Sequence, residues 1–361
     1  MIPKHERVVS SITRTNLGRN LNRDERAVSE VLGVIMMLAM VISIMGGVWV
    51  FLNPYLSDFE DNTNWNKATG IADRLEDRIE VVGDAPDGTG IRHKLSMQKS
   101  ILQGVSNAEI WTISADLASN EQVYLRTISD NSIGITSINE TARKITIITE
   151  TDSYEELFLS TDAEVQIQHN LLFNGWYTIT IYDEVDQPIH RSITYPISGL
   201  KIMTSLATGE HEINLVNNAR VEHFSDGAWE ISKFPSVEFD QLANGGYRLS
   251  MLINNIDVNG TLGISSTLAI DILSIGTMNV FSSECYNIRF SMNNLISPVI
   301  TPQYNELWLS DYYLNRASGT LDEFVGLIPY ERSSGYDGIS VQTLGAPLYL
   351  DVHIQQVVLE K

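Results

Sequence analysis

A long stretch without charged residues constrains this chain more than any other sequence feature. Charged residues stop at Glu30 and resume at Asp58, and the 22 residues of Val31–Leu52 between them are mostly apolar. At a rise of about 1.5 Å per residue, a helix of this length spans about 33 Å, which matches a hydrocarbon core about 30 Å thick. A cleaved secretory signal has a shorter apolar region, followed by a small-x-small site. The stretch ends instead in GVWVFL, so the sequence predicts a retained membrane-spanning helix.

The charges on the two sides of this stretch give it a direction. Residues 1–27 carry 6 of the 24 Lys and Arg residues and 3 of the 45 Asp and Glu residues. With Glu30 set aside, residues 53–361 hold 18 basic and 41 acidic residues, a net charge of −23. Basic flanks stay in the cytoplasm, so we expect a cytoplasmic N-terminus and an extracellular C-terminal region. Nucleic acid is not expected as a partner, because phosphate binding needs a basic surface.

The residues at the front edge of the stretch predict a processing site. A basic residue and a small residue, Arg26 and Ala27, precede the apolar helix in the string RAVSEVLG. This string resembles the class III signal of archaeal type IV prepilins. The resemblance implies that prepilin peptidase cuts after Ala27, which would make residues 1–27 a discarded cytoplasmic leader and Val28 the mature N-terminus. The alternative is a plain signal anchor that is never cut.

Glu30 and Gly33 belong to the same resemblance and would lie at the start of the assembly helix. In a pilus, a carboxylate at this place could pair with the new α-amino group of a neighbouring subunit. Bacterial pilins carry their Glu at the fifth mature position, whereas Glu30 would be third, so that role is only analogous. The alternative is a carboxylate near the headgroups, stabilised by the helix dipole and with no further role.

Beyond the stretch, the sequence predicts that the helix continues into the outer region. Pro54 should kink it or end a turn, because proline lacks an N–H and clashes with the preceding turn. Apolar residues then recur at helical spacing, namely Trp65, Ala68, Ala72, Leu75 and Ile79. Gly83 and Pro86 should end the helix, which gives a predicted helix over residues 28–83, as in pilins.

A second resemblance covers about half of the chain. The spacing of Gly and apolar residues in the helix, the turn around Ala85-Pro86 and the string NARV at 218–221 are similar to a family of membrane-anchored, pilin-like proteins best represented in haloarchaea. The family has no assigned biochemical activity. The resemblance therefore implies an architecture and a location at the cell surface, and no mechanism.

Residues 84–361 carry the pattern of strands. Alternating apolar and polar residues are typical of half-buried strands, and they occur at 143–150, 163–169, 175–183, 247–253 and 349–360. We therefore predict a membrane-spanning α-helix followed by a mainly-β, antiparallel sandwich-like extracellular region. A division into two subdomains near 197–208 is a further expectation.

No sequence pattern indicates catalysis or a bound cofactor or metal. The string HEINL begins like a zinc-protease helix at His211 but lacks the second His, and the acidic string YDEVDQP at 182–188 is more typical of a hairpin turn than of a Ca²⁺ loop. Cys285 is the single cysteine, so no disulfide can form within the chain. Asn139 and Asn259 begin glycosylation sequons, which would suit an outward-facing domain.

Together these features predict a type IV pilin-like protein of the archaeal cell surface. It would be a structural or minor subunit of a pilus-like filament and would act in adhesion or surface assembly. Its partners would be the membrane, prepilin peptidase and other pilin-like subunits. The alternative is a permanently anchored receptor or adhesin whose β-sandwich binds a ligand and which never polymerises. An enzyme is not expected.

Overall fold

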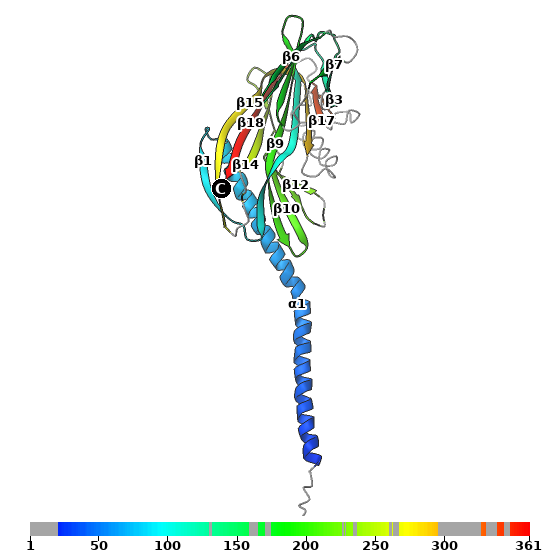
Figure 1. Cartoon of the computed structure of the whole chain (residues 1–361), viewed down its shortest axis with the longest axis vertical. Helices are drawn as coiled ribbons and strands as arrows, with labels where there is room; N and C mark the ends of the chain where they lie inside the picture. Colours follow the sequence, from blue (N-terminus) through cyan, green and yellow to red (C-terminus); the bar gives the residue numbers. More distant parts are fainter. Residues whose placement is uncertain are drawn as a thin grey trace, which may run out of the picture. The chain divides into compact units, whose positions relative to one another are not determined.

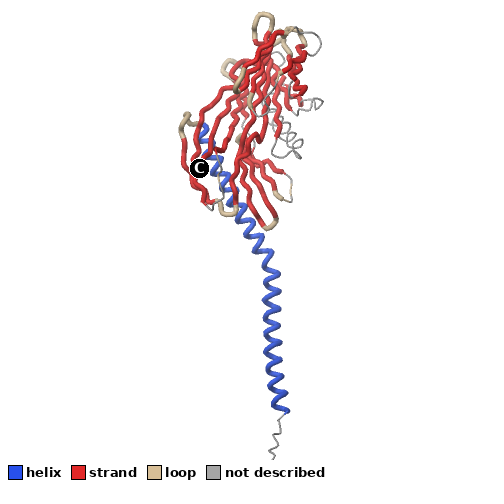
Figure 2. Tube along the Cα trace, in the orientation of Figure 1, coloured by secondary structure: helices blue, strands red, loops and turns tan. Residues whose placement is uncertain are grey.

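The computed structural model contains one long helix and many strands (Figure 2). It describes residues 21–129, 132–158, 165–169, 175–225, 227, 229–233, 237–259, 262, 267–294, 326–329, 338–342 and 347–361. Contacts between residues divide the chain into two compact units, Met1–Phe59 and Glu60–Lys361. The predicted leader, up to residue 20, lies outside the described residues. A single apolar N-terminal helix followed by a mostly β region is therefore confirmed.

The helix α1 (Leu21–Gly83) covers the whole predicted range and continues past Pro54. The helix therefore runs through Pro54, as the predicted range of residues 28–83 requires, and a kink at Pro54 stays a prediction. Proline in a helix removes one hydrogen bond and crowds the preceding carbonyl, but its neighbours still form theirs, and apolar helices tolerate this loss. The end of the helix is as predicted, since Gly83 is its last residue and a tight turn follows, with Ala85 N donating to the Val82 carbonyl at 3.0 Å.

The strands after the helix coincide with the alternating patterns that the sequence contains. The predicted segments contain β5, β7, β8 and the first half of β14, and β18 begins one residue before its predicted start. The strands are β1 (Gly90–Ser96), β2 (Ser100–Asp116), β3 (Val123–Ser129), β4 (Ser132–Ser137), β5 (Lys144–Thr149), β6 (Ser153–Leu157), β7 (Val165–Gln168), β8 (Tyr177–Tyr182), β9 (Pro188–Leu206), β10 (Gly209–Val216), β11 (Ala219–His223), β12 (Trp229–Lys233), β13 (Val237–Gln241), β14 (Tyr247–Asn259), β15 (Thr267–Asn294), β16 (Gly326–Pro329), β17 (Gly338–Gln342) and β18 (Leu348–Glu360).

The described strands form a 15-stranded sheet and a 3-stranded sheet. The main path of the large sheet is β12-β11-β10-β9-β2-β15-β18-β14-β13, with β1 on β15 and a β5–β8 branch on β9, and the small sheet is β3-β4-β7. Figure 1 shows β9, β14, β15 and β18 as the long central strands. The predicted antiparallel arrangement needs one correction, because β14 and β18 pair in parallel from Tyr247–Leu348 to Asn259–Glu360. Alternation marks a half-buried strand but not its direction, which the partner decides.

The predicted division near 197–208 falls inside a regular element. Strand β9 runs through it to Leu206 and pairs with β2 on both sides of a bulge opposite 105–109. At the bulge, the buried residues of β9 change from one apolar cluster to another. Tyr195 and Ile197 belong to one apolar cluster, whereas Leu200 and Ile202 belong to another. The two-subdomain division stays a prediction, and the long strands here pass from one core to the next.

The second apolar cluster contains the inner part of α1. Its helical residues include those that the spacing predicted, and Trp65 packs against its rim. The buried helical members are Ala68, Ile71, Ala72, Leu75, Ile79 and Val82. They pack on β2, β9, β10, β15 and β18. Gly83, the last residue of the helix, lies close to β18, since a Cβ added there would stand 2.6 Å from the Gln355 side-chain oxygen. The amphipathic face predicted for residues 65–79 is therefore confirmed.

Candidate functional site

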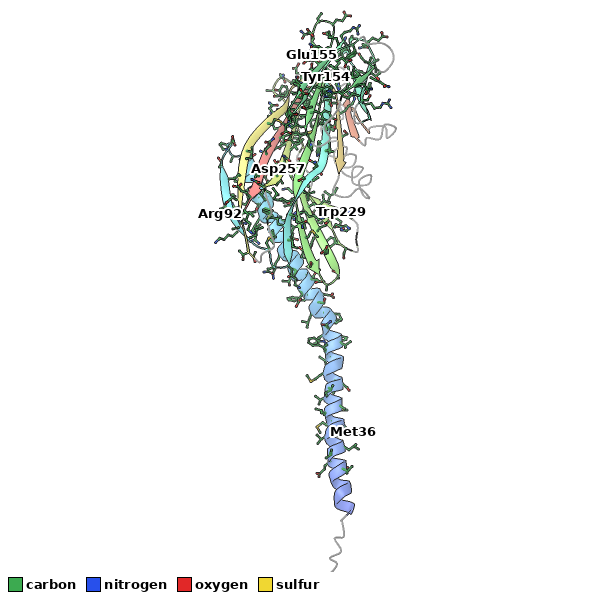
Figure 3. All side chains as sticks on the ribbon, in the orientation of Figure 1. Met36, Arg92, Tyr154, Glu155, Trp229 and Asp257 are labelled. Atoms are coloured by element: carbon green, nitrogen blue, oxygen red, sulfur yellow. The ribbon has the colours of Figure 1, made fainter. Side chains whose placement is uncertain are left out.

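The exposed part of α1 is the first candidate site. All residues from Val28 to Leu56 are exposed, and within the described residues α1 is the one helix long and apolar enough to cross a membrane. The labelled Met36 side chain projects from this helix in Figure 3. An apolar helical surface that is hydrophobic on all sides needs an apolar environment or apolar partners.

The predicted processing residues lie at the start of this helix. Arg26 and Ala27 are within α1, but their side chains lie outside the described residues. Val28 and Glu30 are exposed, and a Cβ added at Gly33 would meet no atom within 4 Å. The residues of the predicted signal are therefore adjacent on one helix whose described side chains are open to an outside partner. Cleavage itself stays a prediction.

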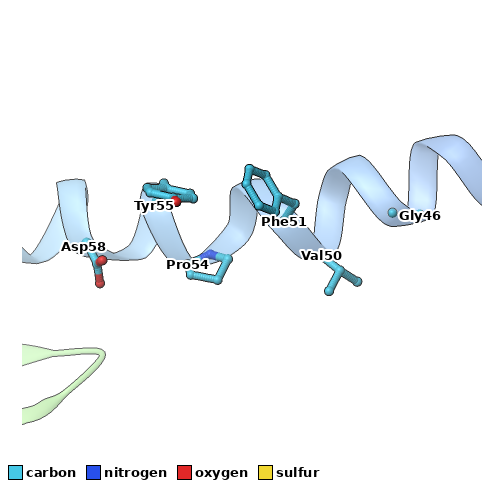
Figure 4. A pocket seen from close by; sticks show the side chains of 7 residues that line it. Gly46, Val50, Phe51, Pro54, Tyr55 and Asp58 are labelled. Atoms are coloured by element: carbon cyan, nitrogen blue, oxygen red, sulfur yellow. The ribbon is translucent and has the colours of Figure 1, made fainter.

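A shallow hollow lies on the same helix further along. It is lined by Gly46, Gly47, Val50, Phe51, Pro54, Tyr55 and Asp58 (Figure 4). The two glycines leave it open because they have no side chains, and the rings of Phe51 and Tyr55 stand 5.6 Å apart between their centroids. Small residues let another helix approach closely. The hollow is open along one side of a single helix and holds no converging acid and base groups in its lining.

The inner part of α1 is fixed to the β strands by polar contacts as well as by the apolar core. The buried carboxylate of Asp61 accepts hydrogen bonds from the backbone N–H groups of Ala207, at 2.9 and 3.0 Å, and Thr208, at 3.3 Å, at the tip of the β9–β10 hairpin. Asp61 therefore anchors the helix to that hairpin.

Arg220 of β11 forms the second anchor. Its guanidinium donates to Glu76 at 2.8 Å and also contacts Asp73, both on α1. Burial opposes the charge of the guanidinium, but the hydrogen bonds to Glu76 and Asp73 raise the pKa of Arg220 above its usual value. Lys233 of β12 adds a longer contact to Glu76 at 3.6 Å. The string NARV was noted in the sequence, but its partners lie more than a hundred residues earlier and no local pattern indicates them.

A buried polar cluster that no sequence pattern indicated lies where β2, β9 and β15 meet. Asp116 is fully buried and accepts hydrogen bonds from Asn287 at 3.1 Å and from the backbone N–H of Val123 at 3.2 Å. His190 Nδ1 lies 2.8 Å from one carboxylate oxygen, and the Arg289 guanidinium lies 3.4 Å from the other. Arg289 also donates to the Val123 carbonyl at 3.0 Å. The cluster fixes the start of β3 against the large sheet.

His190 is the unusual member of this cluster. Burial lowers the pKa of His190, and the hydrogen bond to Asp116 opposes that shift only in part. A neutral imidazole that donates from Nδ1 to Asp116 leaves Nε2 as an acceptor, and this atom is buried without a hydrogen-bond partner in the described residues. No nucleophile is paired with it among the described side chains, so the geometry is that of a structural Asp–His–Arg group and not of a hydrolytic triad.

The remaining predicted residues are separated in space from these clusters. His211 lies on strand β10 and not on a helix, between the rings of Trp65 and Phe224. The acidic turn after β8 is closed by the Asp183 carboxylate, which accepts from the backbone N–H groups of Val185 and Gln187. Among the described residues there is no group of three or more His, Cys, Asp or Glu side chains that could hold a metal ion.

The asparagines of both sequons are exposed. Asn139 is exposed in the turn after β4, but its side-chain nitrogen donates to the backbone carbonyl of Asn120, and Thr141 donates to Glu121 at 2.6 Å. Asn259 is exposed at the end of β14, and Gly260 and Thr261 of its sequon lie outside the described residues. Glycosylation at either position stays a prediction.

Comparisons with known proteins add no relative. No family model, no curated protein and no solved structure matches the chain.

Proposed function

We propose that this protein is a membrane-anchored, type IV pilin-like subunit of an archaeal cell surface. One observation carries the proposal: a single helix is exposed and apolar from Val31 to Leu52, and from Ala68 to Val82 it buries one face in a β core. A helix that serves only as a membrane anchor does not need a second part that packs into the core of the outer domain. A pilin-type subunit uses the first half for the membrane or for neighbouring helices and the second half to hold its outer domain.

In this proposal the N-terminus is cytoplasmic and the β region is extracellular. The basic residues before Ala27 support that direction. We further propose that the β region is a sandwich, with one apolar cluster formed between β14 and β18 on one side and β2 and β9 on the other. The buried residues Leu249 and Val352 from the first pair and Trp111 and Tyr195 from the second support this arrangement.

Prepilin peptidase would remove residues 1–27, and the exposed start of α1 would then join other pilin-like subunits or remain in the bilayer. The large β region favours a minor or specialised subunit that acts in adhesion or surface assembly. N-terminal sequencing of the native protein tests the proposal. A mature chain beginning at Val28 is expected, and a chain beginning at Met1 would favour the permanently anchored receptor or adhesin.

Substitution at the junction provides the matched test. Arg26→Ala should leave the leader of 27 residues attached, which intact-mass measurement detects. Arg23→Ala removes the same charge three residues further from the junction and should be processed normally. Equal processing of both variants would contradict cleavage by prepilin peptidase.

A further inference from the structure

Within the 15-stranded sheet, five neighbouring strands begin and end with edge strands of opposite charge. Strand β1 pairs with β15, and β13 pairs with β14, so that the order from one edge to the other is β1-β15-β18-β14-β13. Within the described residues neither β1 nor β13 has a second strand partner. Figure 1 shows β1 on the outer side of β15. Unpaired N–H and C=O groups along an edge are a template for another strand.

The edge formed by β1 is basic. Arg92 and Lys94 are both exposed and, being two residues apart, lie on the same face of the strand. The Arg92 side chain projects outward in Figure 3 and is 69 % exposed, and it makes a long contact of 3.7 Å to Asp271, which lies opposite it on β15. The pKa of His93 on the same strand is lowered mainly by burial and further by the positive charges of Arg78 and Arg74 on α1. This basic edge is unusual in a region whose net charge is −23.

The edge formed by β13 is acidic. Glu238 and Asp240 are also two residues apart, and they lie opposite Ser250 and Arg248, which alternate with the buried residues of β14. Glu238 is exposed. Asp240 accepts a hydrogen bond at 2.7 Å from Arg248, which lies opposite it on β14. The hydrogen bond to Asp240 raises the pKa of Arg248, and the negative charge of Asp351 raises it further.

We propose that the basic edge, Arg92 and Lys94 of β1, pairs with the acidic edge, Glu238 and Asp240 of β13, in a second copy of this chain. An antiparallel pairing places Arg92 opposite Asp240 and Lys94 opposite Glu238, because each pair of charges has the same two-residue spacing. Opposite charges directly across a strand pair stabilise it, and like charges destabilise it.

The charges also select this pairing over the alternatives. Two β1 edges repel each other, as do two β13 edges, so self-pairing of either edge is disfavoured. The two surfaces that meet are different, which makes the contact heterologous. Such contacts repeat from copy to copy and produce a ring or an open chain of subunits. The contact is independent of leader cleavage, so it can exist whether or not the proposed processing occurs.

A zero-length carbodiimide cross-linker tests this contact in the full chain, either in native membranes or in detergent. The reagent joins an amine to a carboxylate only when they are in ionic contact, and here it should join Lys94 to Glu238. Mixing ¹⁴N and ¹⁵N copies before cross-linking shows by mass spectrometry whether the linked peptides come from different copies. A mixed-isotope Lys94–Glu238 peptide is expected.

Charge exchange makes the test specific. Lys94→Glu and Glu238→Lys should each abolish the mixed-isotope cross-link, and the double variant should restore it with the two groups exchanged. Lys67→Glu changes an exposed cation of α1 that belongs to neither edge strand, and it should leave the cross-link intact. Circular dichroism of each variant verifies folding.

Three outcomes would overturn the proposal. These are the absence of the cross-link in the wild type, cross-links within a single copy only, and failure of the double variant to restore the link. Wild-type binding to phosphatidylglycerol vesicles that Lys94→Glu removes, with no cross-link between copies, would assign the basic edge to an anionic surface instead.

Discussion

At the scale of single residues, the most demanding group is the buried cluster around Asp116. A buried carboxylate is tolerated only when its lone pairs are satisfied. Asp116 meets this condition with His190, Asn287, Arg289 and the N–H of Val123. Because these partners come from three separate parts of the chain, β3, β9 and β15, the cluster can form only when these strands are aligned with β2, which makes it a marker of the complete fold.

The buried histidine predicts a pH dependence of stability. Burial holds the pKa of His190 below its ordinary value of 6.5. Above pH 6.5 both the folded and unfolded states carry a neutral His190, so the stability is fully present there. As the pH falls below 6.5, His190 is protonated in the unfolded chain but stays neutral in the folded chain. The free energy of unfolding therefore falls by up to about 1.4 kcal/mol per pH unit.

Denaturant unfolding of the full chain between pH 7 and pH 5 measures this slope. His190→Asn should be less stable at pH 7 but have a shallower slope. His93 also has a lowered pKa, caused first by burial, so His93→Asn provides the comparison that separates the two contributions. A slope that His190→Asn leaves unchanged would contradict the assignment.

At the scale of elements, α1 combines two different surfaces in one continuous helix. Its residues from Asp61 to Val82 contribute a buried apolar face and the anchors Asp61, Asp73 and Glu76. The apolar face provides most of the stability, because each fully buried aliphatic side chain contributes about 1.5–3 kcal/mol. The polar anchors fix which part of the helix meets which hairpin.

Leu75 should be the most sensitive position of this packing. It is fully buried at the centre of the helical face, so Leu75→Ala should lower the free energy of unfolding by about 2–5 kcal/mol, through lost transfer energy and a cavity. Asp77→Ala, on the exposed side of the same turn, should change it by no more than about 0.5 kcal/mol. Chemical denaturation in detergent measures both, and equal effects would mean that the helix does not pack as described.

At the scale of the whole molecule, the exposed apolar residues decide where the protein is located. The stretch from Val28 to Leu52 presents large apolar side chains on all sides of α1. In water such a surface would cause aggregation, whereas in a bilayer or a bundle of helices it is stable. We therefore expect the protein to sediment with membranes or with assembled filaments.

A charge in the middle of this stretch should prevent insertion. Val41 lies at its centre, and Arg at the centre of a membrane helix costs about 2.5–3.5 kcal/mol on insertion scales. Val41→Arg should therefore reduce the fraction of protein that resists carbonate extraction, and Val41→Leu should not. Full retention of Val41→Arg in the membrane fraction would contradict a membrane-spanning role for this part of the helix.

The sequence by itself determined the features that depend on local pattern. The length and apolar character of Val31–Leu52, the helical face from Trp65 to Ile79, the end at Gly83 and five of the strands follow from periodicity and from glycine and proline chemistry. These are short-range effects, since the signal and the structure lie within the same few turns or residues.

Only the tertiary structure decided which distant segments meet. The parallel direction of β14 and β18, the contacts of Asp61 and Arg220, and the Asp116 cluster had no signal in the sequence. Each depends on partners far along the chain, and an isolated Asp, His or Arg has the same local pattern whether it lies on the surface or in the core. Burial and pairing are properties of the assembled strands, so they appear only when the whole fold is known.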